Sequence, residues 1–287
     1  MPSYTDHFGL ALPPFATAPD PRFAYATRAH ELEILRIQDA VEQRLGLSLL
    51  VGQIGTGKST IAYLLLDSWA MEVDRFAVAY IPDPSAYTPA QFLRLLLASF
   101  GLESSRYIEK NKELLRAFLL DNYEAGRTVV ALLDEAQTIS APNMATLQAL
   151  SNEQTSKTKL IQLCLLAQPN IDRKLSYQPA LRSRIARRGT LDPLIFEDAV
   201  DMMHYRVRVS GGEGKFETLF PEETHRPIYN ATNGIPRRLC ILCDNALFNA
   251  FVGGKPSVDC DSVEAAIRSC QFDNQLDKFD KEEPNGK

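Results

Sequence analysis

Short, continuously apolar runs alternate with amphipathic stretches through the first two thirds of the chain. The apolar runs fall at residues 47–51, 76–81, 128–134 and 160–167, and a further short strand is expected at 189–194. Apolar runs of this length are typical of strands that are buried on both faces of a parallel sheet. The intervening segments repeat their apolar residues at helical spacing, beginning with a helix from about Ala29. This alternation predicts an α/β fold in which a five-stranded parallel sheet lies between two layers of helices.

The pattern changes at both ends of this region. After it, helical segments follow one another without a strand between them, which predicts a small all-helical domain. Before it, the chain is rich in proline and aromatic residues and shows no helical period, so we expect an extended arm that packs on the sheet-containing core. A charged tail follows the helices. The predicted arm, sheet domain, helical domain and tail comprise residues 1–28, 29–194, 195–272 and 273–287.

A glycine-rich loop follows the first apolar strand. Residues 52–60 read GQIGTGKST, which gives the spacing G-x-x-x-x-G-K-[ST] at Gly52, Gly57, Lys58 and Ser59. Glycine permits positive φ and a close approach of the backbone to a ligand, so that successive N–H groups can converge on a phosphate. Lys58 would then reach the β- and γ-phosphates, and the Ser59 hydroxyl would hold Mg²⁺. The alternative is a glycine-rich turn without a ligand, but the flanking strand and helix favour nucleotide binding.

Acidic and amide side chains end two later strands. VVALLDEAQ places Asp134 and Glu135 at the end of the third apolar run, and AQPN places Gln168 at the end of the fourth. The carboxyl ends of parallel strands meet at the ligand crevice of an open sheet. We therefore expect Asp134 to hold Mg²⁺ through water, Glu135 to orient and deprotonate an attacking water, and Gln168 to hydrogen-bond the γ-phosphate. Solvated strand ends are the alternative interpretation of these residues.

Two arginine-bearing segments could complete this site. Arg184 lies in the cluster PALRSRIARRGTLDPL, which is expected to form a helix before the last strand. Such a cluster is compatible with a solvated face, a nucleic-acid patch or an arginine finger for a neighbouring subunit, and its position favours the finger. Arg182 is the second choice for this role. Arg237 follows Gly234 and Pro236 at a helix start, where it can fold back on the phosphates or only cap the helix.

Composition narrows the class of protein. The 287 residues are 45% hydrophobic and 23% charged, as in an ordinary globular protein, and no uninterrupted apolar run is long enough to cross a membrane. The formal net charge of −5 requires any nucleic-acid contact to come from a local basic patch. The odd number of cysteines and the lack of a signal peptide predict reduced thiols in the cytoplasm. Cys240 and Cys243 fall in a helical pattern that favours core packing over zinc binding.

With these motifs in place, the chain resembles AAA+ ATPases of the ExeA/GspA and TnsC-like group from about Tyr4 to Cys270. The resemblance rests on FGL, PF and PDPRFAY near the N-terminus, on the glycine-rich loop, and on LLDEAQ, LLAQPN, RSRIARR and NGIPRRLCILCDNAL. It implies an AAA+ P-loop domain with a helical lid, and a Mg²⁺-dependent ATPase whose slow hydrolysis is stimulated by assembly into a ring or helical homo-oligomer. The implied site residues belong to Walker A (Gly52, Gln53, Ile54, Gly55, Thr56, Gly57, Lys58, Ser59 and Thr60), Walker B (Asp134 and Glu135), sensor 1 (Gln168), the finger (Arg184), sensor 2 (Arg237) and an adenine pocket (Tyr25 and His30).

The resemblance leaves more than one function open. Secretion-associated relatives continue into a membrane span and a peptidoglycan-binding domain, whereas this sequence ends in a polar tail soon after the lid. We therefore expect a transposition regulator that oligomerises with ATP on duplex DNA and links a target-site selector to the transposase. The alternatives are an ATPase that drives assembly of a secretion or envelope complex without DNA, and a nucleotide-dependent scaffold with negligible turnover. Sequence-tolerant contacts to DNA phosphates are expected from Arg106, Lys110, Lys112, Lys157 and Lys159.

Overall fold

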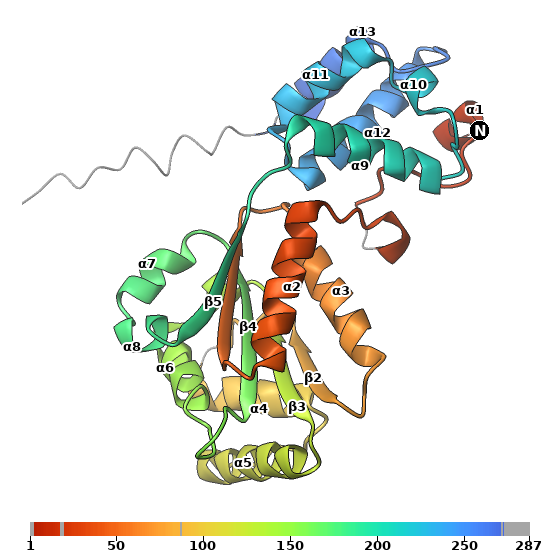
Figure 1. Cartoon of the computed structure of the whole chain (residues 1–287). Coiled ribbons are helices and arrows are strands. Elements are labelled where there is room, and N and C mark those ends of the chain that lie inside the picture. Colours follow the sequence, from red (N-terminus) through yellow and green to blue (C-terminus); the bar gives the residue numbers. More distant parts are fainter. Residues whose placement is uncertain (1–2, 18–19, 87, 271, 273–287) are drawn as a thin grey trace, which may run out of the picture. The chain divides into compact units, whose positions relative to one another are not determined.

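The chain consists of two compact units, one built on a sheet and one built from helices (Figure 1). The computed structural model describes residues 3–17, 20–86, 88–270 and 272. Ala26–Asp192 form the first unit, called the sheet unit below. Met1–Tyr25 and Pro193–Lys287 form the second, called the helical unit.

The sheet unit contains a five-stranded sheet with strand order β2-β3-β4-β1-β5, in which every neighbouring pair is parallel. Its strands are β1 (Leu47–Gly52), β2 (Phe76–Ile81), β3 (Thr128–Leu133), β4 (Ile161–Ala167) and β5 (Ile185–Leu191). The three central strands are buried along their whole length, which is why apolar residues occupy both of their faces. The predicted parallel α/β sheet is therefore confirmed, and the four apolar runs coincide closely with β1 to β4.

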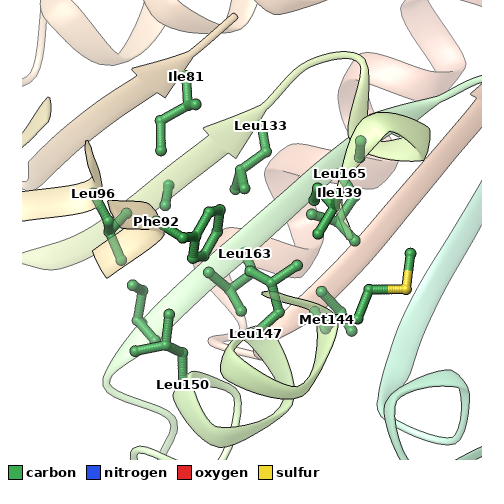
Figure 2. Packing of buried hydrophobic residues seen from close by; sticks show 14 of the residues in the cluster. Ile81, Phe92, Leu96, Leu133, Ile139, Met144, Leu147, Leu150, Leu163 and Leu165 are labelled. Carbon is green, nitrogen blue, oxygen red and sulfur yellow. The ribbon is translucent and has the colours of Figure 1, made fainter. Parts of the chain in front are cut away.

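Helices cover both faces of this sheet. They are α2 (Arg28–Glu42), α3 (Lys58–Ala70), α4 (Pro89–Ser99), α5 (Ile108–Glu124), α6 (Ala141–Leu150), α7 (Ile171–Ser176) and α8 (Pro179–Arg182), with a 3₁₀ turn η2 (Ala136–Thr138). On one face, Leu133 of β3 packs in a cluster with Phe92 of α4 and Leu147 of α6 (Figure 2). On the other, Leu132 packs in a cluster with Leu65 of α3. Because successive strand residues point to opposite faces, one apolar run supplies both cores and produces the three-layer arrangement.

The edge strand β5 begins earlier than the predicted 189–194. It runs from Ile185 to Leu191. Three consecutive residues of this strand are exposed, so it lacks an apolar run. Its contact with α2 is partly polar: a Cβ at Gly189 would lie 1.6 Å from the Glu33 carboxylate. Burial raises the pKa of Glu33, and Arg36 opposes that rise. A strand covered by a carboxylate in this way gives no hydrophobic signal in the sequence.

The helical unit is organised around α12 (Pro236–Val252), whose Leu239, Leu242 and Leu247 are fully buried. Its other elements are α1 (Tyr4–Phe8), η1 (Pro21–Phe23), α9 (Phe196–Val209), α10 (Phe216–Leu219), α11 (Glu222–Thr232) and α13 (Cys260–Cys270). Cys240 and Cys243 are also buried, and burial raises the pKa of both thiols. Their predicted place in the core is confirmed.

The N-terminal arm belongs to the helical unit, whereas the sequence predicted that it packs on the sheet-containing core. Phe8 and Phe15 join the apolar cluster of the helical unit, and the Phe15 ring meets Phe220 edge to face with centroids 5.6 Å apart. The Tyr4 hydroxyl donates a hydrogen bond of 2.6 Å to Asp244. Aromatic rings require apolar surface to cover them, but the sequence does not specify which domain supplies that surface. The arm is also not extended throughout, because it contains α1 and η1.

The boundaries between the units follow from this placement. They fall between residues 25 and 26 and between 192 and 193, whereas the sequence predicted 28/29 and 194/195. The predicted charged tail, 273–287, lies outside the described residues. Among the helices that the structure describes, none is both long and apolar enough to span a lipid bilayer.

Candidate nucleotide-binding site

Three glycines shape the loop between β1 and α3. Gly55 and Gly57 have φ of +83° and +105°, in the left-handed region that residues with a Cβ rarely adopt. Gly52 is required for a different reason: its Cβ would lie 2.8 Å from Thr56 Oγ1 and 2.9 Å from the carbonyl oxygen of Leu191. The spacing predicted from the sequence therefore corresponds to a backbone that side chains at these positions would distort.

Lys58 closes this loop at the start of α3. Its ammonium group donates to the carbonyl oxygens of Gly52 at 2.8 Å and Gln53 at 2.9 Å. Gly57 provides the N-cap of α3 and makes no side-chain capping bond. The first N–H groups of a helix without a side-chain cap are available to an anion, and the helix dipole adds positive charge there. The loop thus combines a lysine, a helix N-terminus and exposed backbone, which are the groups that hold phosphates.

His30 supports the loop from α2. Its Nε2 lies 3.2 Å from the carbonyl oxygen of Thr56, and its Nδ1 lies 2.8 Å from Thr27 Oγ1. The ring is buried and fills the space beside Gly57, where a Cβ would lie 2.7 Å from Nε2. His30 thus lies against the backbone of the predicted phosphate-binding loop, and its predicted place in an adenine pocket stays a prediction.

Ser59 and Asp134 meet at the carboxyl edge of the sheet. The Ser59 hydroxyl donates a hydrogen bond of 2.6 Å to Asp134 Oδ2, and the Glu135 N–H donates to Asp134 Oδ1 at 2.8 Å. Asp134 is buried, and its own N–H donates to the carbonyl oxygen of Ile81 at the end of β2. The two residues predicted to hold Mg²⁺ are therefore in direct contact.

The Ser59–Asp134 pair fits a magnesium ion that arrives with phosphates. Both side chains offer oxygen, which Mg²⁺ prefers, and protein sites usually supply only one or two such ligands, with substrate phosphates and waters completing the octahedron. The described residues contain no cluster of three or more His, Cys, Asp or Glu side chains that could hold a metal by themselves. The donor set is thus suited to a nucleotide-bound ion rather than to a permanent metal.

Glu135 lies beside two amide side chains. Gln168 Nε2, at the end of β4, donates to Glu135 Oε2 at 2.9 Å, and Gln137 Nε2 donates to the same oxygen. Gln137 Oε1 in turn accepts the backbone N–H of Gln168 at 2.9 Å. The structure thus brings Glu135 and Gln168 together as predicted from the strand ends. Gln137 was missed, although its place two residues after Glu135, at the end of an apolar strand, could have drawn attention to it.

Tyr80 adds a phenol to this edge. Burial, and then the nearby Asp134 carboxylate, raise its pKa well above the usual range. Its ring centroid lies 5.9 Å from that of Tyr63 on α3. The shift reflects a phenol that is partly removed from water and lies near the acidic residues at this edge.

Arg184 lies at the opposite, amino edge of the same sheet, because β5 begins at the next residue. It follows the end of α8 and immediately precedes β5, so it is not on a helix as predicted. Its Nε donates to Asn152 Oδ1 at 2.9 Å and its Nη1 donates to the carbonyl oxygen of Ala180 at 2.5 Å. Both partners are neutral, which leaves the positive charge of the guanidinium uncompensated by them. Because the strands are parallel, this residue cannot share an edge with the loop of its own sheet.

Two other arginines of the cluster, Arg187 and Arg188, are paired with carboxylates. Arg187 Nη2 lies 2.9 Å from Asp39, and the two terminal nitrogens of Arg188 each lie 2.7 Å from the Asp172 carboxylate. The hydrogen bonds from Arg188 lower the pKa of Asp172. These pairs favour Arg184 over Arg187 and Arg188 as the arginine offered to another molecule.

Comparison with known proteins shows which family the sheet unit is similar to. Residues 41–175 match the family model of the AAA domain, a segment that contains the loop, Asp134, Glu135 and Gln168. This part of the sheet unit is therefore similar to an AAA domain. Over 260 residues it is also 32% identical to general secretion pathway protein A of Aeromonas hydrophila. That match covers 89% of this chain and 46% of the relative, so this chain spans less than half of the relative's length.

Solved structures share the fold at lower sequence identity. Aeropyrum pernix ORC2, solved as ADPNP–ADP complexes, matches with a TM-score of 0.64 and 18% identity, over 93% of this chain and 74% of that one. Cdc6p of Pyrobaculum aerophilum matches with a TM-score of 0.69 and 15% identity, over 90% of this chain and 71% of that one. Drosophila ORC bound to DNA matches with a TM-score of 0.67 and 16% identity, over 99% of this chain and 72% of that one. The predicted fold, an AAA+ α/β domain followed by a helical part, is thereby confirmed.

The secretion relative bears on the function expected from the sequence. A general secretion pathway protein favours the alternative, an ATPase of a secretion or envelope complex. The relatives described above give no support to the transposition regulator, the transposase or the target selector that the sequence suggested.

Two residues predicted to contact the nucleotide lie in the helical unit rather than in the sheet unit. Tyr25 packs against Tyr205 with ring centroids 5.5 Å apart, and Arg237 is exposed in the first turn of α12. Their predicted roles, in an adenine pocket and as sensor 2, stay predictions.

The basic residues predicted to contact DNA lie on the sheet unit, around the start of α5 and in the segment before β4. Lys112 pairs with Glu109 at 2.9 Å, Lys159 donates to Gln154 at 2.6 Å, and the Arg106 guanidinium lies 4.7 Å from the Tyr107 ring centroid. Lys110 and Lys157 are exposed. An ion pair between Arg116 and Glu153 joins the two segments. This surface is therefore exposed and of mixed charge.

Replacing Gly57 with alanine is expected to weaken nucleotide binding by about tenfold or more, because left-handed strain of about 1–2 kcal/mol and the contact with His30 both displace the loop. The measurement is titration of a fluorescent ATP analogue. Gly101→Ala is the matched control, since Gly101 has φ of +74° but no atom within 4 Å of the Cβ position. Equal affinities of the wild type and Gly57→Ala would show that the loop does not hold the nucleotide.

Proposed function

We propose that this chain is a Mg²⁺-dependent ATPase that works as a homo-oligomer and drives assembly of a secretion or envelope complex. One observation carries the proposal: the acidic and phosphate-binding groups share the carboxyl edge of the sheet, while Arg184 lies at the amino edge. A site built in this way needs a second copy of the chain to supply the arginine.

The groups at the carboxyl edge have complementary roles. The loop N–H groups and Lys58 would hold the β- and γ-phosphates, and Ser59 and Asp134 would hold Mg²⁺, which neutralises charge that develops on the phosphate oxygens. Glu135 would orient the attacking water and accept its proton. The Gln168 amide would donate a hydrogen bond to the γ-phosphate, at a position adjacent to the Glu135 carboxylate.

Arg184 would act on the nucleotide of a neighbouring copy. Its guanidinium is held by Asn152 and Ala180 oxygens and keeps its full charge, so exchange of these neutral partners for a phosphate is electrostatically favourable. An arginine supplied in trans stabilises transition-state charge and makes hydrolysis depend on assembly.

The 32% identity to general secretion pathway protein A supports the secretion or envelope role. The second candidate is the transposition regulator on duplex DNA, which the exposed basic residues at α5 and before β4 favour. The net charge of −5 and the acidic partners within that surface weigh against it.

Mixing two inactive variants tests the proposed oligomer. Glu135→Gln removes the base but keeps the finger, and Arg184→Ala removes the finger but keeps the base. Each alone should hydrolyse ATP at least about 100-fold more slowly than the wild type. A one-to-one mixture should recover about one quarter of wild-type activity, because that fraction of randomly formed head-to-tail interfaces pairs an intact base with an intact finger.

The measurement is steady-state phosphate release at a protein concentration at which assembly is verified by light scattering. Arg187→Ala, at an exposed arginine paired with Asp39, is the control and should retain wild-type activity. Wild-type turnover by Arg184→Ala alone, or no recovery in the mixture, would contradict the shared site.

Titration of duplex DNA separates the two candidate roles. With a non-hydrolysable ATP analogue, the secretion or envelope role predicts no nucleotide-dependent binding at either about 50 or 200 mM salt. The transposition role predicts binding that requires the analogue, falls steeply with salt and weakens in a Lys110→Gln/Lys112→Gln/Lys157→Gln variant. Such binding would replace the secretion role with the DNA role.

A further inference from the structure

Gln137 uses both ends of its side-chain amide on residues of the proposed site. It lies in the turn η2, two residues after Glu135, and only 6% of it is exposed. Its Nε2 donates to Glu135 Oε2, and its Oε1 accepts the Gln168 backbone N–H at 2.9 Å. A buried side chain that only filled space would not need both a donor and an acceptor here.

The backbone of Glu135 is strained at this point. Its φ of +47° and ψ of 36° are left-handed, which costs about 1–2 kcal/mol for a residue with a Cβ. Its carbonyl oxygen accepts the N–H and the hydroxyl of Thr138, both at 2.8 Å, and its N–H donates to Asp134. Strain of this kind persists where the surroundings impose it, and it is often found at functional sites. Here it directs the carboxylate toward the ends of β3 and β4.

The turn that carries Gln137 is anchored independently of the Gln137 side chain. Lys174 Nζ, from α7, donates to the carbonyl oxygens of Gln137 and Ile139, the latter at 3.0 Å. These bonds fix the backbone of η2 against α7. The side-chain amide of Gln137 is therefore not required to hold the turn in place, and its bonds act on the Glu135 carboxylate and on the end of β4.

We propose that Gln137 is a positioning residue for Glu135. Two amides, from Gln137 and Gln168, donate to the same carboxylate oxygen and together restrict rotation of the carboxylate plane. Because Gln137 also holds the backbone of Gln168, it sets the position of the carboxylate relative to the residue proposed to contact the γ-phosphate. This inference rests on the proposed ATPase function, in which Glu135 accepts a proton from water.

Gln137→Met tests the role by removing both hydrogen bonds at similar side-chain volume. We expect kcat for ATP hydrolysis to fall about 10- to 100-fold, since small displacements of a reacting group have effects of this size. KM and the affinity for a fluorescent ATP analogue should stay within about twofold of wild type, because no phosphate contact is removed. Gln38→Met is the matched control, since the Gln38 side chain on α2 donates to Ser68 on α3 at 3.3 Å.

Gln137→Glu tests the same role with an almost unchanged side-chain shape. The new carboxylate can still accept the Gln168 N–H, but it presents a second negative charge to Glu135 in place of a hydrogen-bond donor. We expect kcat of this variant to fall at least as far as that of Gln137→Met, whereas a side chain that only filled space would tolerate a change of so similar a shape.

Three results would overturn the inference: wild-type kcat for Gln137→Met, a loss of kcat matched by a loss of ATP affinity, or wild-type kcat for Gln137→Glu. Glu135→Gln separates this failure from that of the proposed function. If Glu135→Gln hydrolyses ATP normally, the proposed base is wrong. If Glu135→Gln is inactive while Gln137→Met is unimpaired, only the positioning role fails.

Discussion

Parallel pairing of β3, β4 and β1 is the constraint on which the site depends. In a parallel sheet every strand ends at the same edge, so residues more than a hundred positions apart are delivered to one place. The hydrogen bond of 2.6 Å between Ser59 and Asp134 is the direct result, because it joins the helix after β1 to the end of β3. The amide of Gln168 at the end of β4 completes the set.

The same constraint separates Arg184, the proposed finger, from Glu135, the proposed base. Arg184 precedes β5 and therefore lies at the amino edge, where its partners are the neutral oxygens of Asn152 and Ala180. A parallel sheet cannot bring both edges together within one copy. In the proposed mechanism, dependence of hydrolysis on assembly follows from this separation, without an additional regulatory element.

Apolar runs and glycine spacing gave a close prediction of the sheet and the loop, because burial on two faces and left-handed backbone both leave strong signals in sequence. The start of β5 was missed, since Glu33 covers Gly189 with a carboxylate and the strand lacks an apolar run. The arm was assigned to the wrong unit, because the Phe15 ring indicates burial but not its partner Phe220. Gln137 and the contact of His30 with Thr56 depend on side-chain geometry that spacing does not encode.

The most direct test of the account is the distance between the Arg184 guanidinium of one copy and the γ-phosphate bound by the next. It can be measured by cryo-electron microscopy of the oligomer assembled with Mg²⁺ and a non-hydrolysable ATP analogue. The account predicts hydrogen-bond contact across the interface, with the nucleotide on the loop that precedes Lys58. An oligomer with bound nucleotide in which every Arg184 still contacts Asn152 of its own copy would contradict the account.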